Sequence, residues 1–496
     1  MINSLKYFNE VCIKKFENIE DEFIKDPHDI SSYVINVKEV LEDLGVVIIK
    51  EMLEDLDQLI KDSSARKKSW IVERSASKTL ITSLGTVNYN KTYYSDKVTG
   101  QTVCLLDKLM DITDHKRITE DAIANVLTES VQTSYRRGGE NVSIGRTAVS
   151  KQTVKNILHN LKFPDIDNPT EKKVVDYLYI DADEDHVALQ FKDQRGDIEK
   201  NEDGYKNNTF LTKLAYVYEG VEKEAPQSKR HRLINPYYFS GSGAYETNEE
   251  FWNEVYEYIE SHYDTSKIKK IFLNADGGPW IKGCRTKLTD ITYVLDEFHM
   301  KKYLVKMTSH LEKSFSKKEV KEIRKIINEI IKENTKEEFR NAIKYLQEYA
   351  EDDIEKQRIE NAGDFFLRNW MAAKKRFSDR KNIKGCSAEG HVSHVLATRM
   401  SSRPMGWSKR GATQMAKLRA YYLNGGDMLT LARYQEEALP QAAGAELELP
   451  LSASEILRSE RNRHGITGKY VEALPYYEMP VSVKKRLTIQ HHIAGL

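Results

Sequence analysis

With 496 residues, 40% of them hydrophobic and 31% charged, the chain is long enough for two or three domains, and the absence of any run of about twenty apolar residues excludes a transmembrane helix. The four cysteines are scattered, which argues against a disulfide framework or a structural zinc site, and the segment Met1–Lys6 lacks the apolar core of a secretory signal, so we expect a cytoplasmic protein. Lys plus Arg and Asp plus Glu number 76 each, so bulk charge does not favour a nucleic-acid partner and any basic surface must be local.

The N-terminal part of the chain has two patterns. In residues 1–75, apolar side chains recur at helical spacing from Phe8 to Ile48 and predict an amphipathic pair of helices. Such a stripe usually packs within the monomer, and a dimer contact is the alternative. In residues 76–117 the pattern changes to strand-like runs such as 87–94, which predict a small β-hairpin unit.

Residues 118–162 have the pattern of two short helices. Thr119 is a candidate cap of the first helix and Ser150 of the second, and a basic break with two glycines lies between them at 135–139. This arrangement is typical of a helix-turn-helix that places its second helix in the DNA major groove, but any small helical domain could show it. Residues 163–170 contain two prolines and are expected to be a linker.

Residues 171–299 have an informative order of elements. Apolar runs predict strands at 174–182, 187–191, 210–218, 268–275 and 291–295, and a helix at 248–262. Three strands, a helix and further strands are the order of a ribonuclease-H-like α/β domain. Apolar residues at helical steps in a highly charged background predict an all-helical insertion over 300–384, after which the catalytic core resumes at 385–425. A C-terminal region, 426–496, completes the chain.

Three acids lie where an element of this domain ends or begins. Asp183 follows the first predicted strand, Asp276 follows the fourth strand in a Gly-Gly-Pro turn, and Glu389 follows the helical insertion. Hard carboxylate oxygens that leave coordination positions open suit Mg²⁺, and two such ions about 4 Å apart assist phosphoryl transfer on a nucleic acid. Each acid also has an ordinary interpretation, as part of a solvated turn or as a helix cap.

Four motifs in a fixed order resemble those of a known family. They are Tyr179 to Val187 (YIDADEDHV), Leu273 to Ile281 (LNADGGPWI), Val294 to His299 (VLDEFH) and Glu389 to His394 (EGHVSH). With these motifs the chain resembles the ISLre-type bacterial insertion-sequence transposases, which are relatives of the Mutator-like transposases. The resemblance spans nearly the whole chain.

The resemblance implies a catalytic triad in a ribonuclease-H-like domain. Asp183, Asp276 and Glu389 take its three positions and are expected to hold two Mg²⁺ or Mn²⁺ ions. Members of the family often have Asp-Gly after the first strand, whereas this chain has further acids there, so Asp181 and Asp185 remain substitutes for the first ligand.

A second pair of residues matches the family near the site. Asp296 and His299 match the Asp-x-x-His element of the Mutator-like relatives, which lies close to the triad. We therefore expect both side chains beside the three acids.

The resemblance also implies double-stranded DNA as partner, both the terminal inverted repeats of an element and its target, bound by a homodimer or higher oligomer. Local basic and polar groups are the candidates for these contacts, with a solvated surface as the alternative for each. They are Arg136, Arg137, Lys151, Gln152, Lys155, Lys229, Arg230, Arg232, Arg399, Arg403, Lys409 and Arg410.

The implied function is that of a DNA transposase, which hydrolyses the phosphodiester at the element ends and joins the freed 3′-hydroxyl to target DNA. One alternative is a domesticated, sequence-specific DNA-binding protein without the chemistry. Another is a structure-selective nuclease on the same fold, which would cut DNA without strand transfer.

Overall fold

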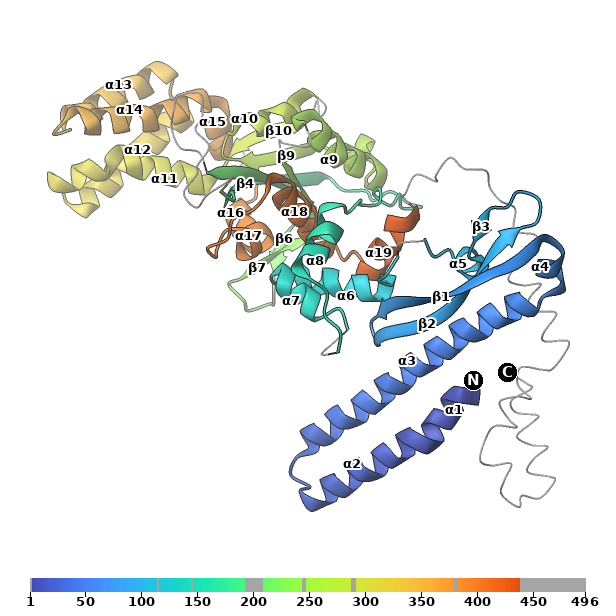
Figure 1. Ribbon diagram of the computed structural model, residues 1–496. Helices are drawn as coiled ribbons and strands as arrows, with labels where there is room; N and C mark the ends of the chain where they lie inside the picture. Colours follow the sequence, from blue (N-terminus) through green and yellow to red (C-terminus); the bar gives the residue numbers. More distant parts are fainter. Residues whose placement is uncertain are drawn as a thin grey trace. The chain divides into compact units, whose positions relative to one another are not determined.

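The structure is a computed structural model that describes residues 2–113, 116–143, 146–191, 208–242, 247–286, 291–378 and 382–437. The protein is a mixed α/β protein with two compact units, one formed by residues up to 157 together with helix α19 and the other by residues 158–427 (Figure 1). In the described ranges, no helix is both long and apolar enough to cross a membrane. Most of the predicted C-terminal region, residues 438–496, lies outside the described residues.

The first unit begins with the predicted amphipathic helices, which are confirmed. Its elements are α1 (Ile2–Tyr7), a π-helical turn (Phe8–Cys12), α2 (Ile13–Lys25) and α3 (Ile30–Asp62). The carboxylate of Asp29 caps α3 by accepting a hydrogen bond from Ser32 N at 3.0 Å. Cys12, Ile19 and Val40 are buried where α2 packs on α3.

The predicted β-hairpin is also confirmed. The elements of this segment are α4 (Ser64–Ser69), β1 (Trp70–Thr82), β2 (Gly85–Asp96), β3 (Thr102–Val103) and α5 (Leu105–Leu109). β1 and β2 pair antiparallel around a tight turn, and β3 pairs with the end of β2. β1 starts at Trp70, so the hairpin is longer than the apolar runs indicated.

Three helices follow where two were predicted. They are α6 (Glu120–Ser130), α7 (Tyr135–Glu140) and α8 (Lys151–His159), and α19 (Met428–Glu437) packs against α6. The expected break at 135–139 is wrong, because it forms α7, whose cap Ser134 accepts a hydrogen bond from Arg137 N at 3.2 Å. A Cβ on Gly138 would lie 2.0 Å from Ser130 Oγ, so this glycine permits close packing of α7 on α6.

The second unit is built on a five-stranded mixed sheet. Its strands are β4 (Tyr177–Ala188), β5 (Thr209–Tyr218), β8 (Tyr237–Ser242), β9 (Lys270–Ala275) and β10 (Ile291–Leu295), and β6 (Gly220–Lys223) pairs with β7 (His231–Ile234) in a separate hairpin. Across the sheet the order is β10-β9-β4-β5-β8. β4, β5 and β8 are antiparallel neighbours, whereas β9 and β10 run parallel to β4.

The sequence predicted most of this unit, but the prediction divided β4 in two and missed β8 and the β6–β7 hairpin. The predicted helix is α9 (Asn248–His262), and β5, β9 and β10 lie where strands were expected. The strands predicted at 174–182 and 187–191 are one strand, β4, because the acidic run between them stays paired with β5. β8 was not predicted, because its sequence YYFSGS ends in small residues and lacks a strand-like apolar run. These small residues contact α18, where Ser242 Oγ and Thr413 Oγ1 lie 2.6 Å apart.

The sheet lies between two layers of helices. On one face, Leu178, Ile180 and Ala182 of β4 pack with α9 in an apolar core. Side chains alternate along a strand, so the odd-numbered residues of β4 point to the opposite face. That face is covered by α16 (Ala388–Val392) and α18 (Lys409–Leu423), which follow the helical insertion in the chain.

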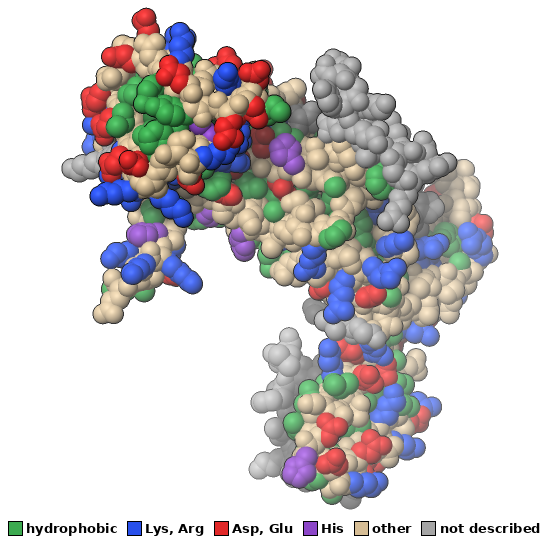
Figure 2. All heavy atoms as spheres, turned by 90° about the vertical axis from the view of Figure 1, so that its left-hand side faces the viewer, with side chains coloured by type: hydrophobic (Ala, Val, Ile, Leu, Met, Phe, Trp, Pro, Cys, Tyr) green, Lys and Arg blue, Asp and Glu red, His purple; other side chains and the backbone are tan. Residues whose placement is uncertain are grey.

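The helical insertion has a core of its own, which confirms the all-helical prediction. Its elements are α11 (Glu297–Thr308), a 3₁₀ turn (Ser309–Lys313), α12 (Lys317–Glu333), α13 (Lys336–Glu348), α14 (Asp353–Arg368) and α15 (Trp370–Ser378). Phe339, Phe366 and Trp370 are buried among them. Figure 2 faces this insertion and shows acidic and basic side chains interspersed around hydrophobic ones, so charge of one sign does not dominate that surface.

The helix after the insertion is interrupted by a π-helical turn. α16 continues through the turn (Ser393–Ala397) into α17 (Thr398–Met400), and a loop then leads to α18. The Arg419 guanidinium donates to two carbonyls of this turn, to His394 O at 2.6 Å and also to Val395 O. The residues of this turn are therefore held in place by α18.

Candidate active site

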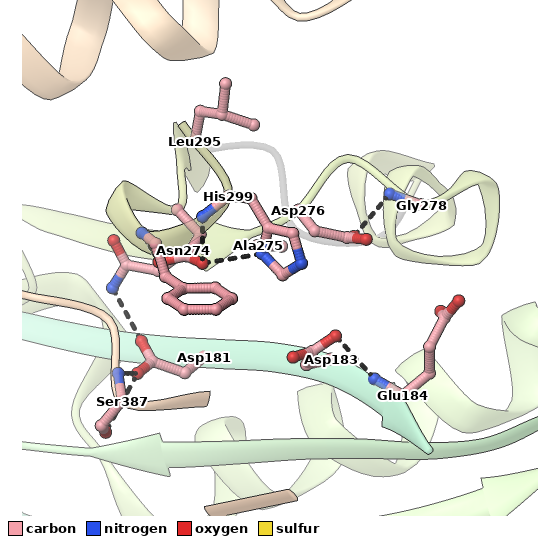
Figure 3. A network of polar contacts seen from close by, with 12 residues as sticks. Asp181, Asp183, Glu184, Asn274, Ala275, Asp276, Gly278, Leu295, His299 and Ser387 are labelled. Carbon is pink, nitrogen blue, oxygen red and sulfur yellow. Dashed lines mark hydrogen bonds and ion pairs between the residues drawn. The ribbon is translucent and has the colours of Figure 1, made fainter. Parts of the chain in front are cut away.

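The acids of β4 line one face of the strand. Asp181, Asp183 and Asp185 alternate with Ala182 and Glu184, so the three aspartates point to the side away from α9. Asp183 was expected at the end of a strand, and this is wrong, because β4 continues to Ala188. The strand backbone therefore fixes the spacing of all three carboxylates, of which Figure 3 labels Asp181 and Asp183.

Asp183 and Asp276 are brought together by the parallel pairing of β4 with β9. Ala182 is the register partner of Ala275; Asp183 is the next residue of β4, and Asp276 immediately follows the end of β9. Burial and the nearby Asp276 carboxylate raise the pKa of Asp183 to about 6, while Glu184 N donates to its Oδ1 at 2.9 Å. Figure 3 shows the two carboxylates on the same side of the strands. A cation between them would relieve their repulsion.

Asp276 is held by the turn that follows β9. Its Oδ1 accepts a hydrogen bond from Gly278 N at 2.8 Å, and Gly277 between them has φ of +97°. A Cβ on Gly277 would also lie 2.7 Å from Asn369 Oδ1, so another residue at this position would be strained in its backbone and would displace the Asn369 side chain.

We expect Gly277→Ala to lower the free energy of unfolding by about 1–3 kcal/mol and to displace the Asp276 carboxylate, because alanine is strained at positive φ. Urea unfolding measures the first effect and Mn²⁺ affinity the second. Gly283→Ala is the matched control, since Gly283 has φ of −62° and its Cβ would meet no atom closer than 3.6 Å. Equal losses in both variants would contradict this account of the turn.

Asp296 and His299 lie beside the two acids. Asp296 caps α11 by accepting hydrogen bonds from Phe298 N and His299 N, both at 3.2 Å, and its Oδ2 lies 2.8 Å from His299 Nδ1. Burial acts to raise the pKa of Asp296, but these hydrogen bonds hold it below its usual range. Burial acts to lower the pKa of His299, yet Asp296, Asp183 and Asp276 together raise it. The imidazole is thus oriented by one carboxylate and faces two others.

Asp181 is fully buried beneath the site and its oxygens are occupied by donors. Tyr216 Oη and Tyr218 Oη donate to it at 2.8 and 3.0 Å, Asn274 Nδ2 at 2.7 Å and Ser387 N at 2.9 Å. Burial raises its pKa, and the hydrogen bonds oppose that effect. Its lone pairs are used within the protein, which leaves little capacity for an external ligand.

The two remaining acids of β4 also have partners. Ser401 Oγ donates to Asp185 Oδ1 at 3.0 Å, and burial raises the pKa of Asp185. Trp280 Nε1 donates to the carboxylate of Glu184, and burial raises the pKa of Glu184 as well. Of the three aspartates of β4, Asp183 is the one whose pKa the Asp276 carboxylate raises.

Glu389 lies on the first turn of α16 and is exposed. His391, two residues further on, is within 3.0 Å of Tyr238 Oη through Nδ1 and packs on the Tyr216 ring at 4.5 Å, and burial lowers its pKa to about 4. α16 is therefore anchored on β5 and β8. Among the described residues, no three His, Cys, Asp or Glu side chains are gathered closely enough to hold a metal ion, so the structure brings together two of the three predicted ligands.

The candidate DNA-contacting residues divide into exposed and buried ones. Exposed side chains are those of Arg136 and Arg137 on α7, Lys151, Gln152 and Lys155 on α8, Lys229, Arg230 and Arg232 at the β6–β7 hairpin, and Arg403, Lys409 and Arg410 before or on α18. Arg410 donates to His159 O at 2.6 Å and Arg232 to Glu222 Oε1 at 2.7 Å. Arg399 is 4% exposed and lies 4.9 Å from the Trp407 ring, so its expected place on the surface is wrong.

Sequence reasoning missed the polar network beneath the acids. Arg376 of α15 donates to Asn274 Oδ1 at 3.0 Å, and Asn274 in turn donates to Asp181. A polar Asn274 in the otherwise apolar run of β9 is the local signal that could have indicated it, because a buried amide requires partners. The identity of those partners depends on residues far away in the chain.

Comparisons with known proteins match most of the chain to one protein family. The family described as "Uncharacterised protein family (UPF0236)" matches residues 24–437. A UPF0236 protein of Caldanaerobacter subterraneus subsp. tengcongensis, whose name carries eleven locus designations, is 35% identical over 427 residues, 86% of this chain and 84% of that protein. Another from the same strain, with four locus designations, is 36% identical over the same shares. A UPF0236 protein in the vanSb 3′ region of Streptococcus gallolyticus is 24% identical and covers 72% of this chain and 75% of its own length.

Among solved structures, a chain of the Drosophila P element transposase strand transfer complex is similar with a TM-score of 0.21 and 13% identity. The match covers 78% of this chain and 95% of that chain. A TM-score this low does not establish a shared fold.

Proposed function

The chain belongs to the UPF0236 family, and from this membership and the geometry of the acids we propose that it is a DNA transposase that uses Mg²⁺ or Mn²⁺ to cut element ends and to join the freed 3′-hydroxyl to target DNA. The observation that carries the proposal is the meeting of Asp183 and Asp276 on neighbouring parallel strands, beside the Asp296–His299 pair. Carboxylates placed in this way are suited to a divalent cation that also binds phosphate oxygens.

The topology of the sheet supports the proposal. Three antiparallel strands, β4, β5 and β8, are followed by β9 and β10 parallel to β4, with β4 central and β9 beside it. We interpret this order as that of the proposed ribonuclease-H-like domain, in which acids of the first and fourth strands are expected to meet. Here those strands are β4 and β9, which carry Asp183 and lead to Asp276.

The carboxylate oxygens of Asp183 and Asp276 suit hard divalent cations, and Glu389, which does not form a three-acid cluster with them among the described residues, is the proposed third ligand. Asp183, Asp276 and Glu389 would hold Mg²⁺ or Mn²⁺, which activate the attacking oxygen and stabilise the leaving oxygen of a phosphodiester when bound. Asp183 is favoured as first ligand over Asp181, whose lone pairs are occupied, and over Asp185, because the Asp276 carboxylate acts on the pKa of Asp183 and not on that of Asp185. Glu389 is exposed on α16, so DNA or metal can reach it. The contact with Asp296 holds the His299 imidazole in its orientation beside Asp183 and Asp276.

The names of the relatives favour a mobile element. One relative carries eleven locus designations in a single strain and another carries four. Many loci for one protein are what a transposing element generates, whereas a regulator is expected at one locus. We extend this inference to the present chain because it is 35% and 36% identical to these proteins over 427 aligned residues, which are 84% of the length of each.

The proposed DNA contacts begin with α8. Lys151, Gln152 and Lys155 are exposed on one side of this helix, while Val154 and Leu158 are buried on the other. A short helix with a polar, basic outer face fits the major groove, and Arg136 and Arg137 on α7 are exposed for contacts with phosphates. Two element ends must be handled in one reaction, so we propose a dimer or higher oligomer on DNA.

We expect the double variant Lys151→Glu/Lys155→Glu to bind DNA about tenfold or more weakly than the wild type, with a smaller dependence of affinity on salt, because it loses phosphate contacts. Fluorescence anisotropy with a duplex that carries the element end measures both. Lys318→Glu is the control, because Lys318 is exposed on α12 of the helical insertion. Equal affinity for the double variant and the control would exclude α8 from the DNA interface.

The function is tested by incubating the purified chain with Mg²⁺ and a duplex that carries the nucleotide sequence on either side of its own gene. Cleavage at the element ends and joining to a second duplex are expected, and EDTA should abolish both. Specific binding without cleavage would instead identify a DNA-binding regulator. Cleavage without joining would identify a nuclease.

A further inference from the structure

The buried carboxylate of Asp181 links the segments that carry the three proposed metal ligands. Asn274 Nδ2 donates to its Oδ1 at 2.7 Å, and Ser387 N donates to its Oδ2 at 2.9 Å. Asn274 belongs to β9 and Ser387 immediately precedes α16. One side chain of β4 therefore touches both other segments (Figure 3).

The three linked residues have the same offset from the proposed ligands. Asp181 is two residues before Asp183, Asn274 is two residues before Asp276, and Ser387 is two residues before Glu389. In an extended strand, residues two apart lie on the same face, about 7 Å along the chain. The hydrogen bond between Asp181 and Asn274 therefore restrains Asp183 and Asp276, which lie two residues further along their segments. The hydrogen bond from Ser387 restrains the start of α16 in the same way.

The orientation of the Asn274 amide is set from the other side. Arg376 Nη2 donates to Asn274 Oδ1 at 3.0 Å, so the amide nitrogen must face Asp181. Arg376 also donates to Leu295 O at 3.0 Å and to Lys384 O at 2.9 Å. The helical insertion thus contributes a fixed cation to the network.

We propose that Asp181 is a positioning residue, which sets the separation of Asp183, Asp276 and Glu389 by tying β9 and the start of α16 to β4. This inference rests on the proposed function, because it concerns the same three acids. Asp181 does not touch the metal or the DNA. It acts through the hydrogen bonds that Asn274 and Ser387 donate to it.

The chain offers a matched control for this role. Tyr218 Oη donates to the same Oδ1 of Asp181 at 3.0 Å, but it belongs to β5, which carries none of the proposed ligands. Tyr218→Phe removes one hydrogen bond from Asp181 and leaves the bonds from Asn274 and Ser387. Asp181→Asn keeps the shape of the side chain, but its amide nitrogen opposes one of those two donors.

The test is the affinity of the full chain for Mn²⁺ alone, measured by isothermal titration calorimetry without DNA. We expect Asp181→Asn to bind Mn²⁺ about 10- to 100-fold more weakly than the wild type, as for other residues that orient metal ligands, and Tyr218→Phe to stay within about threefold. Raising the Mn²⁺ concentration should restore the DNA cleavage of Asp181→Asn in proportion. Circular dichroism and the urea midpoint of each variant report its fold separately.

A second variant tests the same hydrogen bond if Asp181→Asn does not fold. Asn274→Ala removes the donor from β9 without a new clash, and the same loss of Mn²⁺ affinity is expected. Equal Mn²⁺ affinity in the wild type, in Tyr218→Phe and in the folded network variants would overturn the positioning role while leaving the proposed function intact. Failure of the wild type itself to bind Mn²⁺ would overturn both.

Discussion

Asp276→Asn should lose at least about 10³-fold in the rate of Mg²⁺-dependent cleavage and joining while DNA affinity stays within a few-fold of the wild type. The proposed metal site supplies several kcal/mol of transition-state stabilisation, and each 1.4 kcal/mol corresponds to about tenfold in rate. An amide lacks the charge that attracts the cation, yet its oxygen still accepts the hydrogen bond from Gly278 N that the carboxylate accepts at 2.8 Å. Single-turnover kinetics on a duplex with the element end measure the rate.

Asp353→Asn is the control for this variant. Asp353 lies at the start of α14 and its side chain is fully exposed, so the same substitution there changes charge without touching the acids. A cleavage rate for Asp276→Asn equal to that of Asp353→Asn would exclude Asp276 from the chemistry.

Arg376→Met should be the most destabilising single substitution near the site, with a loss of about 3–5 kcal/mol in the free energy of unfolding. The guanidinium is buried and donates to Leu295 O, Lys384 O and Asn274 Oδ1. Methionine fills similar volume but leaves two buried acceptors and the partly buried Lys384 O without their donor. Each buried acceptor costs about 1–3 kcal/mol, and relaxation of the surroundings reduces this cost. Urea unfolding followed by tryptophan fluorescence measures the loss.

Arg368→Met serves as the matched variant. Arg368 is exposed near the end of α14 and makes a single hydrogen bond, to Asp364 O at 3.3 Å. We expect its effect to stay below about 0.5 kcal/mol. A similar, small change for Arg376→Met would mean that water satisfies the three acceptors.

The sequence predicted elements whose signals are local. α9 begins after Thr247, whose side chain and that of Glu250 cap each other's backbone, and such a capping box is readable within four residues. The β-branched and apolar run of β10 is equally local. In contrast, the acidic run in β4 has the composition of a turn, and it stays extended because β5 pairs with it, which is a tertiary effect.

The sequence predicted only those site residues that directly follow a recognisable strand. Asp276 and the Asp296–His299 pair follow strands that the pattern reveals, so their proximity could be expected. The burial of Asp181 could not, because its donors Tyr216, Asn274 and Ser387 are 35, 93 and 206 residues away. The burial of Arg399 depends in the same way on Trp407, which lies across a loop.

The bonds of Arg376 have a consequence for how the chain tolerates change. Leu295 is the last residue of β10, just before the helical insertion, and Lys384 is its last residue, just before α16. The Arg376 side chain bonds to both and so joins the two ends of the insertion. When the two ends of an inserted segment are already close, added length costs only a slowly growing closure entropy. The connection between α13 and α14, with its exposed Glu351 and Asp352, is therefore the place where the chain can lengthen, shorten or accept a foreign domain with least disturbance of the acids.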